Sequence, residues 1–165
     1  MFASAQPDTP SGMKRLLILL ALALAAWSAP AAAQSGLVAF ETGTLSIETA
    51  AGQTHDFRIE IAETPEQRAQ GLMFRRHLDA DAGMLFLFGS VEARGMWMKN
   101  TLIPLDMLFI DEAGKIVRIE ERTVPHSLRA IVSGGPVSAV LELNAGTASR
   151  LAIKPGDRVR HPAFE

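Results

Sequence analysis

Apolar and polar positions alternate along much of the chain, and this alternation predicts β-strands. Within 54–62 every second residue from Phe57 to Ile61 is apolar, and charged residues lie between them. A period of two is typical of a half-buried strand. Two continuous apolar runs, 83–88 and 106–110, predict short strands that are buried on both faces.

Shorter patterns predict further strands, with turns between them. We expect these strands at 44–49, 96–98, 115–122, 137–143 and 158–161. Asp111–Gly114 has the composition of a hairpin turn, and Lys154–Asp157 has Pro and Gly at the central positions of a type II turn. The segment 125–136 contains prolines and adjacent glycines and predicts a long loop.

Two short helices are predicted from their first residues. Thr64 can cap a helix, Pro65 suits the first helical position, and Gln67 completes a capping box. A second helix is expected at 145–152, with Asn144 as its N-terminal cap.

About seven short strands, two short helices and no alternating strand–helix order predict a mainly β domain. The chain has 165 residues, of which 48% are hydrophobic, enough for a core of its own. We expect a small closed or partly closed β-barrel, because closure removes exposed sheet edges. A two-sheet β-sandwich is the alternative.

The chain begins with the features of a secretory signal peptide. Lys14 and Arg15 precede a continuous apolar run, Leu16–Ala26, of the length of a signal-peptide core. Small residues that end at Ala33 offer a cleavage site before Gln34. The alternative is a retained membrane anchor, although such a helix needs about twenty apolar residues.

This leader sets the expected domain boundaries and location. We expect a signal peptide at 1–33, a flexible lead-in at 34–43 and a single β-rich domain at 44–165. A start at Met13 would give an ordinary bacterial signal peptide, so the residues before it are an extended leader or a misassigned start. The mature protein is then periplasmic or secreted, without stable membrane insertion.

Composition narrows the function classes. The formal net charge of −2 does not favour nucleic acid as a partner. Because the chain has no cysteine, disulfides, zinc–thiolate sites and thiol catalysis are excluded. The four histidines lack ligand spacing, so we expect no metal site and no cofactor. Met96 and Met98 leave one alternative, a soft-metal protein that binds Cu(I).

The candidate binding site contains a cation, several hydrogen-bonding side chains and one aromatic ring. Its residues are Trp97, Lys99, Asn100, Thr101, Asp106, Glu142 and Asn144. Rigid polar loops on a β scaffold often bind ligands, so we expect a non-enzymatic binding module for a small polar molecule, a glycan or an envelope protein. The alternative is that these residues are scaffold, with Asn144 as a helix cap.

Asp106 and Glu142 are the best candidates for a pair of carboxylates. A structural ion pair with an arginine is the expected role, and general acid–base chemistry in a hydrolase is the alternative. A serine hydrolase is poorly supported, because there is no G-x-S-x-G motif. No residue is therefore assigned as catalytic.

Four ordered motifs resemble one known family. They are Thr64-Pro65-Glu66-Gln67 through Arg75, Gly83-Met84-Leu85-Phe86, Trp97-Met98-Lys99-Asn100-Thr101 through Asp106, and Leu141-Glu142-Leu143-Asn144 through Asp157. Over residues 55–160 the chain resembles the domain of unknown function 192 family of small, often exported prokaryotic proteins. The resemblance implies a compact β-barrel-like fold with short helices, and no established activity or cofactor.

Overall fold

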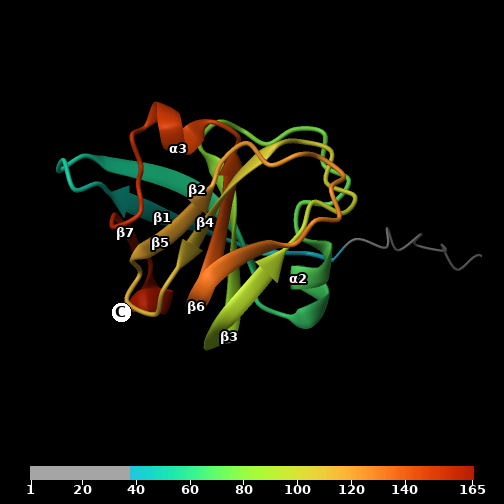
Figure 1. Ribbon diagram of the computed structural model, residues 1–165, viewed down its shortest axis with the longest axis horizontal. Coiled ribbons are helices and arrows are strands. Elements are labelled where there is room, and N and C mark those ends of the chain that lie inside the picture. The colour runs from blue at the N-terminus through green and yellow to red at the C-terminus, as the bar shows by residue number, and fades with distance from the viewer. Residues whose placement is uncertain (1–37) are drawn as a thin grey trace, which may run out of the picture. The chain divides into compact units, whose positions relative to one another are not determined.

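The computed structural model describes residues 38–165, and the predicted signal peptide at 1–33 lies outside this part. The strands are β1 (Glu41–Glu48), β2 (Thr54–Ala62), β3 (Ala82–Met96), β4 (Leu105–Ile110), β5 (Ile116–Glu120), β6 (Ile131–Asn144) and β7 (Arg158–Arg160). The helices are α2 (Pro65–Gln70), α3 (Thr147–Arg150) and the 3-10 turn η1 (Pro162–Phe164). Figure 1 shows their arrangement.

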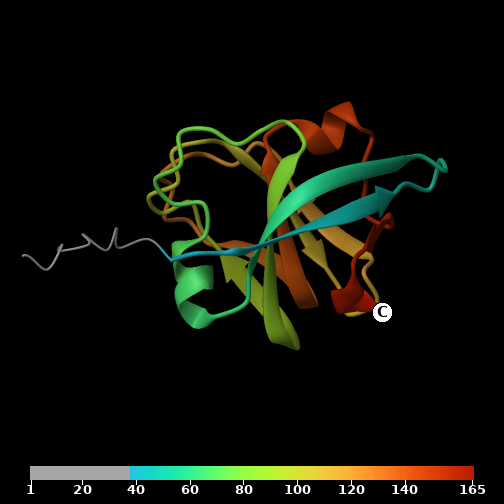
Figure 2. The ribbon, with the colours of Figure 1, turned by 180° about the vertical axis from the view of Figure 1, so that it is seen from behind.

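All seven strands belong to one mixed sheet in the order β5-β4-β6-β3-β2-β1-β7. A bridge between Lys115 and Arg158 joins the two ends of this order. Beside it, Val159 donates a backbone hydrogen bond of 2.7 Å to Gly114. The sheet is therefore a nearly closed barrel (Figures 1 and 2), and the alternative of two separate sheets is wrong.

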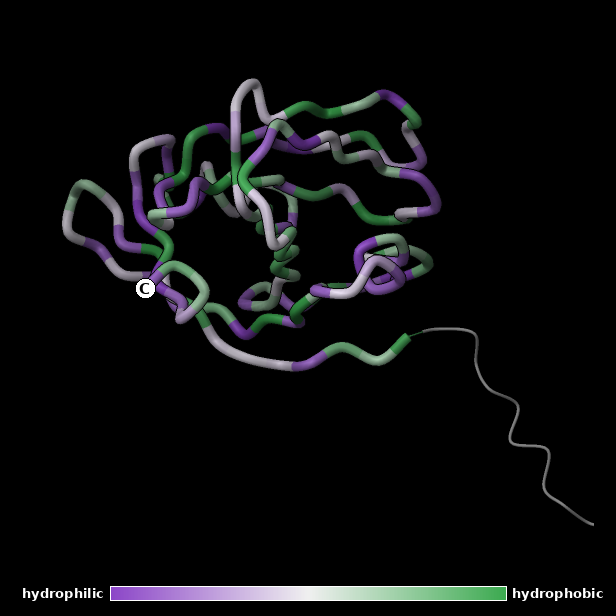
Figure 3. Tube along the Cα trace, turned by 90° about the horizontal axis from the view of Figure 1, so that it is seen from below, coloured by the Kyte–Doolittle hydropathy of each residue, from purple (hydrophilic) through white to green (hydrophobic). Residues whose placement is uncertain are grey.

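The sheet has apolar clusters on both faces. The first contains residues from every strand, such as Leu85, Leu108 and Leu141, and fills the barrel interior. The second includes Met107 and Val140 and lies on the other face of β3, β4 and β6, against residues of the connecting segments. In Figure 3 green hydrophobic stretches alternate with paler and purple stretches along the chain.

Two local predictions are confirmed. Every residue of Leu105–Ile110 is buried, because β4 has a neighbouring strand on each side and apolar clusters on both faces. The capping box of α2 is also present. The Gln67 amide nitrogen donates to the Thr64 hydroxyl at 3.2 Å, and the Gln67 side chain accepts from the Thr64 amide at 3.0 Å.

Two predicted segments differ in type from the structure. The predicted loop at 125–136 is partly strand, because β6 begins at Ile131 and pairs Val132 with Gly95. Shifts of register in the β3–β6 ladder accommodate the adjacent glycines. The predicted strand at 96–98 does not form, since Met96 is the last residue of β3.

The predicted helix at 145–152 is shorter and has a different cap. α3 covers Thr147–Arg150, and its N-terminal cap is Gly146 with φ of 84°. Asn144 instead ends β6. Within residues 38–165 neither this helix nor α2 has the length and apolar character needed to cross a membrane.

Candidate functional site

A cavity of about 330 Å³ opens between α2, β3, β6 and the segment after β3. Four of the seven predicted site residues line it: Trp97, Lys99, Thr101 and Glu142. Because Glu142 is its most unusual member, we name this cavity the Glu142 pocket. α2 and the connecting segments lie on the same side of the sheet in Figures 1 and 2.

Glu142 is a buried carboxyl group without a partner. Only 4% of the residue is exposed, and in the sheet it lies between Met84 of β3 and Met107 of β4. Among the described residues none donates a hydrogen bond to its carboxyl or forms an ion pair with it. Burial raises the pKa of Glu142 from 4.5 to about 8, so this side chain is protonated at neutral pH.

A cation and an aromatic ring lie together in the lining of the same cavity. Lys99 is exposed, and its Nζ is 5.1 Å from the centre of the Trp97 ring. At this distance a cation is attracted to the face of the ring. Trp97 itself is 50% exposed, so the pair stands at the mouth of the Glu142 pocket.

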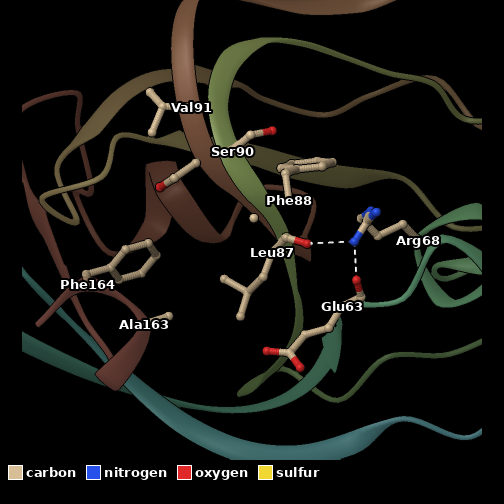
Figure 4. A pocket seen from close by; sticks show the side chains of 10 residues that line it. Glu63, Arg68, Leu87, Phe88, Ser90, Val91, Ala163 and Phe164 are labelled. Atoms are coloured by element: carbon tan, nitrogen blue, oxygen red, sulfur yellow. Dashed lines mark hydrogen bonds between the residues drawn. The ribbon is translucent and has the colours of Figure 1, made fainter.

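Arg68 supplies a second cation from α2. Its guanidinium donates to the Leu87 carbonyl at 3.0 Å and also to the Glu63 carbonyl, as Figure 4 shows. The Arg68 Cζ is 5.7 Å from the centre of the Phe88 ring. Arg68 and Phe88 line both the Glu142 pocket and a neighbouring cavity of about 550 Å³, whose lining Figure 4 shows, and so form part of the wall between the two.

Backbone hydrogen bonds hold three connecting segments together beside the Glu142 pocket. Phe74 donates to Asn100 at 2.9 Å, and His126 donates to Thr101 at 3.1 Å. Phe74, Asn100 and His126 each have a positive φ. Such conformations are costly for residues with side chains and persist where surrounding contacts enforce them. Asn100 does not line the Glu142 pocket, and its side chain lies 3.8 Å from the sulfur of Met73.

Asp106 lies away from the Glu142 pocket, on the interior face of the barrel. Its carboxyl accepts backbone hydrogen bonds from Arg122 at 2.9 Å, Gly146 at 3.0 Å and Ala148 at 2.9 Å. These contacts tie β4 to the start of α3, where a negative charge is favourable. The expected ion pair with an arginine is wrong for Asp106 as well as for Glu142 in the part of the chain described here.

The predicted pairing of Asp106 with Glu142 is also wrong. In the β4–β6 ladder Asp106 lies opposite Leu143, whereas Glu142 lies opposite Met107. Because side chains alternate between faces along a strand, the two carboxyls lie on opposite sides of the sheet.

Asn144 has a structural role that differs from the predicted helix cap. Its side-chain amide donates to the carbonyl groups of Leu78 and Asp79, both at 2.8 Å. These bonds fasten the segment before β3 to the end of β6. Like Asn100 and Asp106, Asn144 therefore lies outside the Glu142 pocket.

Sequence reasoning missed the apolar walls of the Glu142 pocket. Leu72, Phe86, Phe88 and Met96 line it together with residues of α2. Phe86 and Phe88 alternate with their neighbours in step with Met84, so the sequence indicates that all three side chains lie on one face of their strand. The sequence does not show which strand pairs beside that face.

The methionines give a mixed result for the predicted soft-metal site. Met96 lines the Glu142 pocket, whereas the sulfur of Met98 is buried and accepts a hydrogen bond of 3.1 Å from Thr123. Among the described residues no group of three or more histidines or carboxylates could hold a metal ion.

Comparison with known proteins identifies the family. The model of DUF192, described as Uncharacterized ACR, matches residues 46–161. The chain belongs to the DUF192 family. This match confirms the resemblance found in the sequence, and the family description assigns no activity. No curated protein matches the chain.

Two solved structures are similar to this DUF192 protein. A proposed transcription regulator from Sinorhizobium meliloti 1021 is 51% identical, with a TM-score of 0.75 over 78% of this chain and 99% of that chain. A protein of unknown function from Novosphingobium aromaticivorans DSM 12444 is 38% identical, with a TM-score of 0.71 over 74% of this chain and 86% of that chain.

Proposed function

We propose that this DUF192 protein is an exported binding module that takes a small ligand in the Glu142 pocket. The observation that carries the proposal is Glu142 itself, a carboxyl group that is buried, without a partner and open to a cavity. A ligand in the cavity can hydrogen-bond to the Glu142 carboxyl, whereas the Asp106 carboxyl already accepts from three backbone amides.

The composition of the pocket supports the same proposal. Polar side chains stand among apolar and aromatic ones, and they are Arg68, Gln70, Lys99, Thr101 and Glu142. This is the usual composition of small-molecule sites, in which apolar walls supply affinity and a few polar groups fix orientation. The cavity of about 330 Å³ suits a small ligand better than a glycan chain or a protein surface.

The proposal includes export to the periplasm or outside the cell. It rests on the basic and apolar leader and on the small residues that end at Ala33. After cleavage the domain would remain without a membrane anchor.

A fragment screen by NMR tests the binding function. Amide signals of the domain that begins at Gln34 would be recorded with small acids, alcohols, amines and amides, one at a time. We expect some fragments to shift the amides of Leu72, Phe86 and Lys99. The proposal is wrong if fragments shift amides elsewhere on the domain or none at all. Glu142→Leu, which removes the polar group, serves as the matched control.

The proposal does not extend to nucleic acid. One similar structure is described as a proposed transcription regulator, but that description gives no activity for this chain. The net charge here is −2, and the described helices have six and four residues. Recognition helices in the major groove are longer and carry basic residues.

A soft-metal protein is the second candidate function. All five methionines of the described residues lie in the second apolar cluster or line the Glu142 pocket: Met73, Met84, Met96, Met98 and Met107. Thioethers suit Cu(I), although methionines also fill irregular cores. Titration with Cu(I) of the native protein and of Met73→Leu/Met96→Leu distinguishes these roles, because equal affinities would exclude a pocket site.

The geometry does not favour the hydrolase alternative. Hydrolysis by two carboxyls requires both groups to face one substrate, and glycosidases place them within about 10 Å across the bond that breaks. Here the sheet separates Asp106 from Glu142. Glu142 alone retains a pKa of about 8, and a binding role accounts for it without a second catalytic group.

A further inference from the structure

The mouth of the Glu142 pocket carries positive charge. Lys99 stands there beside Trp97, and Arg68 reaches the pocket from α2. Among the residues that line this cavity the one carboxyl is Glu142, which is buried and neutral at pH 7. The local field therefore favours an anion and disfavours a cation.

The walls of the pocket are partly apolar. Leu72, Phe86, Phe88 and Met96 line the same cavity as the exposed cation and the buried acid. Burial of apolar ligand surface here would contribute roughly 25 cal/mol per Å², so an extended hydrocarbon segment is the suitable body for the ligand.

Glu142 offers a hydrogen-bond donor at depth. The neighbouring strands place Met84 and Met107 beside it, and the charged groups that share its cavity are Arg68 from α2 and Lys99 from the segment after β3. Neither cation offsets the desolvation that raises the pKa of Glu142 to about 8. A protonated carboxyl donates one hydrogen bond, so it needs an acceptor on the ligand.

We propose that the Glu142 pocket takes a small organic anion with an apolar body, whose anionic group lies near Lys99 and whose distant hydrogen-bond acceptor contacts the Glu142 carboxyl. The inference rests on the proposed function and names the ligand class for the same site. Keto acids and acylated amino acids have this chemistry.

Four probes of similar length separate the parts of this inference. Calorimetric titration would compare 6-oxoheptanoate, which has both groups, with heptanoate, heptan-2-one and heptylamine. We expect 6-oxoheptanoate to bind most tightly, and loss of either the ketone or the carboxylate to weaken binding about tenfold. Heptylamine should not bind.

Three substitutions assign these effects to residues. Glu142→Gln keeps a hydrogen-bond donor and should keep its affinity for 6-oxoheptanoate. Glu142→Leu should bind 6-oxoheptanoate and heptanoate with equal affinity. Lys99→Met should bind 6-oxoheptanoate and heptan-2-one with equal affinity. Raising the pH from about 7 to about 9 should weaken 6-oxoheptanoate about tenfold in the native protein, because Glu142 loses its proton, and leave Glu142→Gln unchanged.

Several results would overturn the inference. Tightest binding of heptylamine would show that the pocket selects cations, and the same affinity of 6-oxoheptanoate for Glu142→Leu as for the native protein would remove the acid from recognition. If none of the four probes binds while other fragments shift the pocket amides, the ligand class is wrong and the binding function stands. If fragments also fail, both are wrong.

Discussion

Asp106 and Glu142 lie on adjacent strands, and their carboxyl groups lie on opposite faces of the sheet. Three backbone amides donate to Asp106, whereas Glu142 faces a cavity and has no partner among the described residues. The two acids of similar chemistry therefore differ in role. Substitution of Asp106 should change stability, and substitution of Glu142 should change ligand binding and pH dependence.

Asp106→Asn should destabilise the domain by about 2–4 kcal/mol, because an amide places an N–H group where backbone amides donate. Urea unfolding followed by circular dichroism measures the change. Asp56→Asn, at an exposed position of β2, is the control and should change stability by less than about 0.5 kcal/mol. Equal effects of the two substitutions would contradict a scaffold role for Asp106.

The contribution of Glu142 to the stability of the native protein should fall as the pH rises from 4.5 to about 8. In this range the folded state keeps the proton of Glu142, whereas the unfolded state, with a pKa of 4.5, has lost it. Proton binding therefore stabilises the fold fully below pH 4.5, and the loss by about pH 8 is on the order of 4 kcal/mol. Urea unfolding at several pH values measures this slope.

Glu142→Gln provides the control for this pH dependence, since an amide of nearly the same shape does not titrate. Its unfolding free energy should lack the decline that Glu142 contributes, while other titrating groups act alike in both proteins. Parallel profiles for the two proteins would show that Glu142 titrates normally and that the cavity hydrates it.

Gly83→Ala should destabilise the domain by about 1–3 kcal/mol, or more if the strands separate. A Cβ at Gly83 would lie 2.7 Å from the Glu142 carbonyl oxygen and 2.7 Å from Leu143 Cδ2. Gly95→Ala in the same strand is the matched control, because its Cβ would have no atom within 4 Å. Thermal unfolding of both variants tests this difference. Similar melting temperatures for Gly83→Ala and Gly95→Ala would contradict the predicted clash at Gly83.

Lys99 and Asn100 should respond differently to substitution although they are neighbours. Asn100 has a φ of 55° and its carbonyl accepts from Phe74, so Asn100→Ala should cost about 1 kcal/mol and Asn100→Gly less. Lys99→Ala should leave stability nearly unchanged and weaken anion binding. Thermal unfolding measures the effect on stability, and titration measures the effect on anion binding. If Lys99→Ala destabilises the domain and Asn100→Ala does not, the structural role belongs to Lys99 and not to Asn100.

Cell fractionation should find a processed protein outside the cytoplasm. Mass spectrometry of that protein should give an N-terminus at Gln34, and Leu19→Arg, which interrupts the apolar run, should leave the full-length chain in the cytoplasm. Recovery of the unprocessed native chain from the cytoplasm would contradict export.

Local signals in the sequence were sufficient for many of the elements. The capping box of Thr64 and Gln67 and the apolar run that ends at Ile110 depend on neighbouring residues, and the structure confirms both. Face parity also places Glu142 and Val140 together. The sequence could not predict that α2 covers the face of β6 on which Glu142 lies. That arrangement depends on the pairing of β6 with β3 and β4 and on the position of α2.

Two errors have the same physical origin. Adjacent glycines at Gly134 and Gly135 are typical of a loop, yet pairing with the distant strand β3 keeps this segment within β6. Asn144 has the composition of a helix cap, but its amide instead bonds to carbonyl groups 65 and 66 positions away. Tertiary contacts override local preference in both cases.

β7, near the end of the domain, pairs with β1, near its beginning, and the Lys115–Arg158 bridge links β7 to the β5 end of the sheet. The Ser46–Arg160 pair can form only after the last strand has been synthesised. Contacts of such long sequence separation slow folding. A chain moving through a translocase from its N-terminus would thus stay threadable until its final residues emerge, and removal of β7 should leave a permanently open, aggregation-prone sheet.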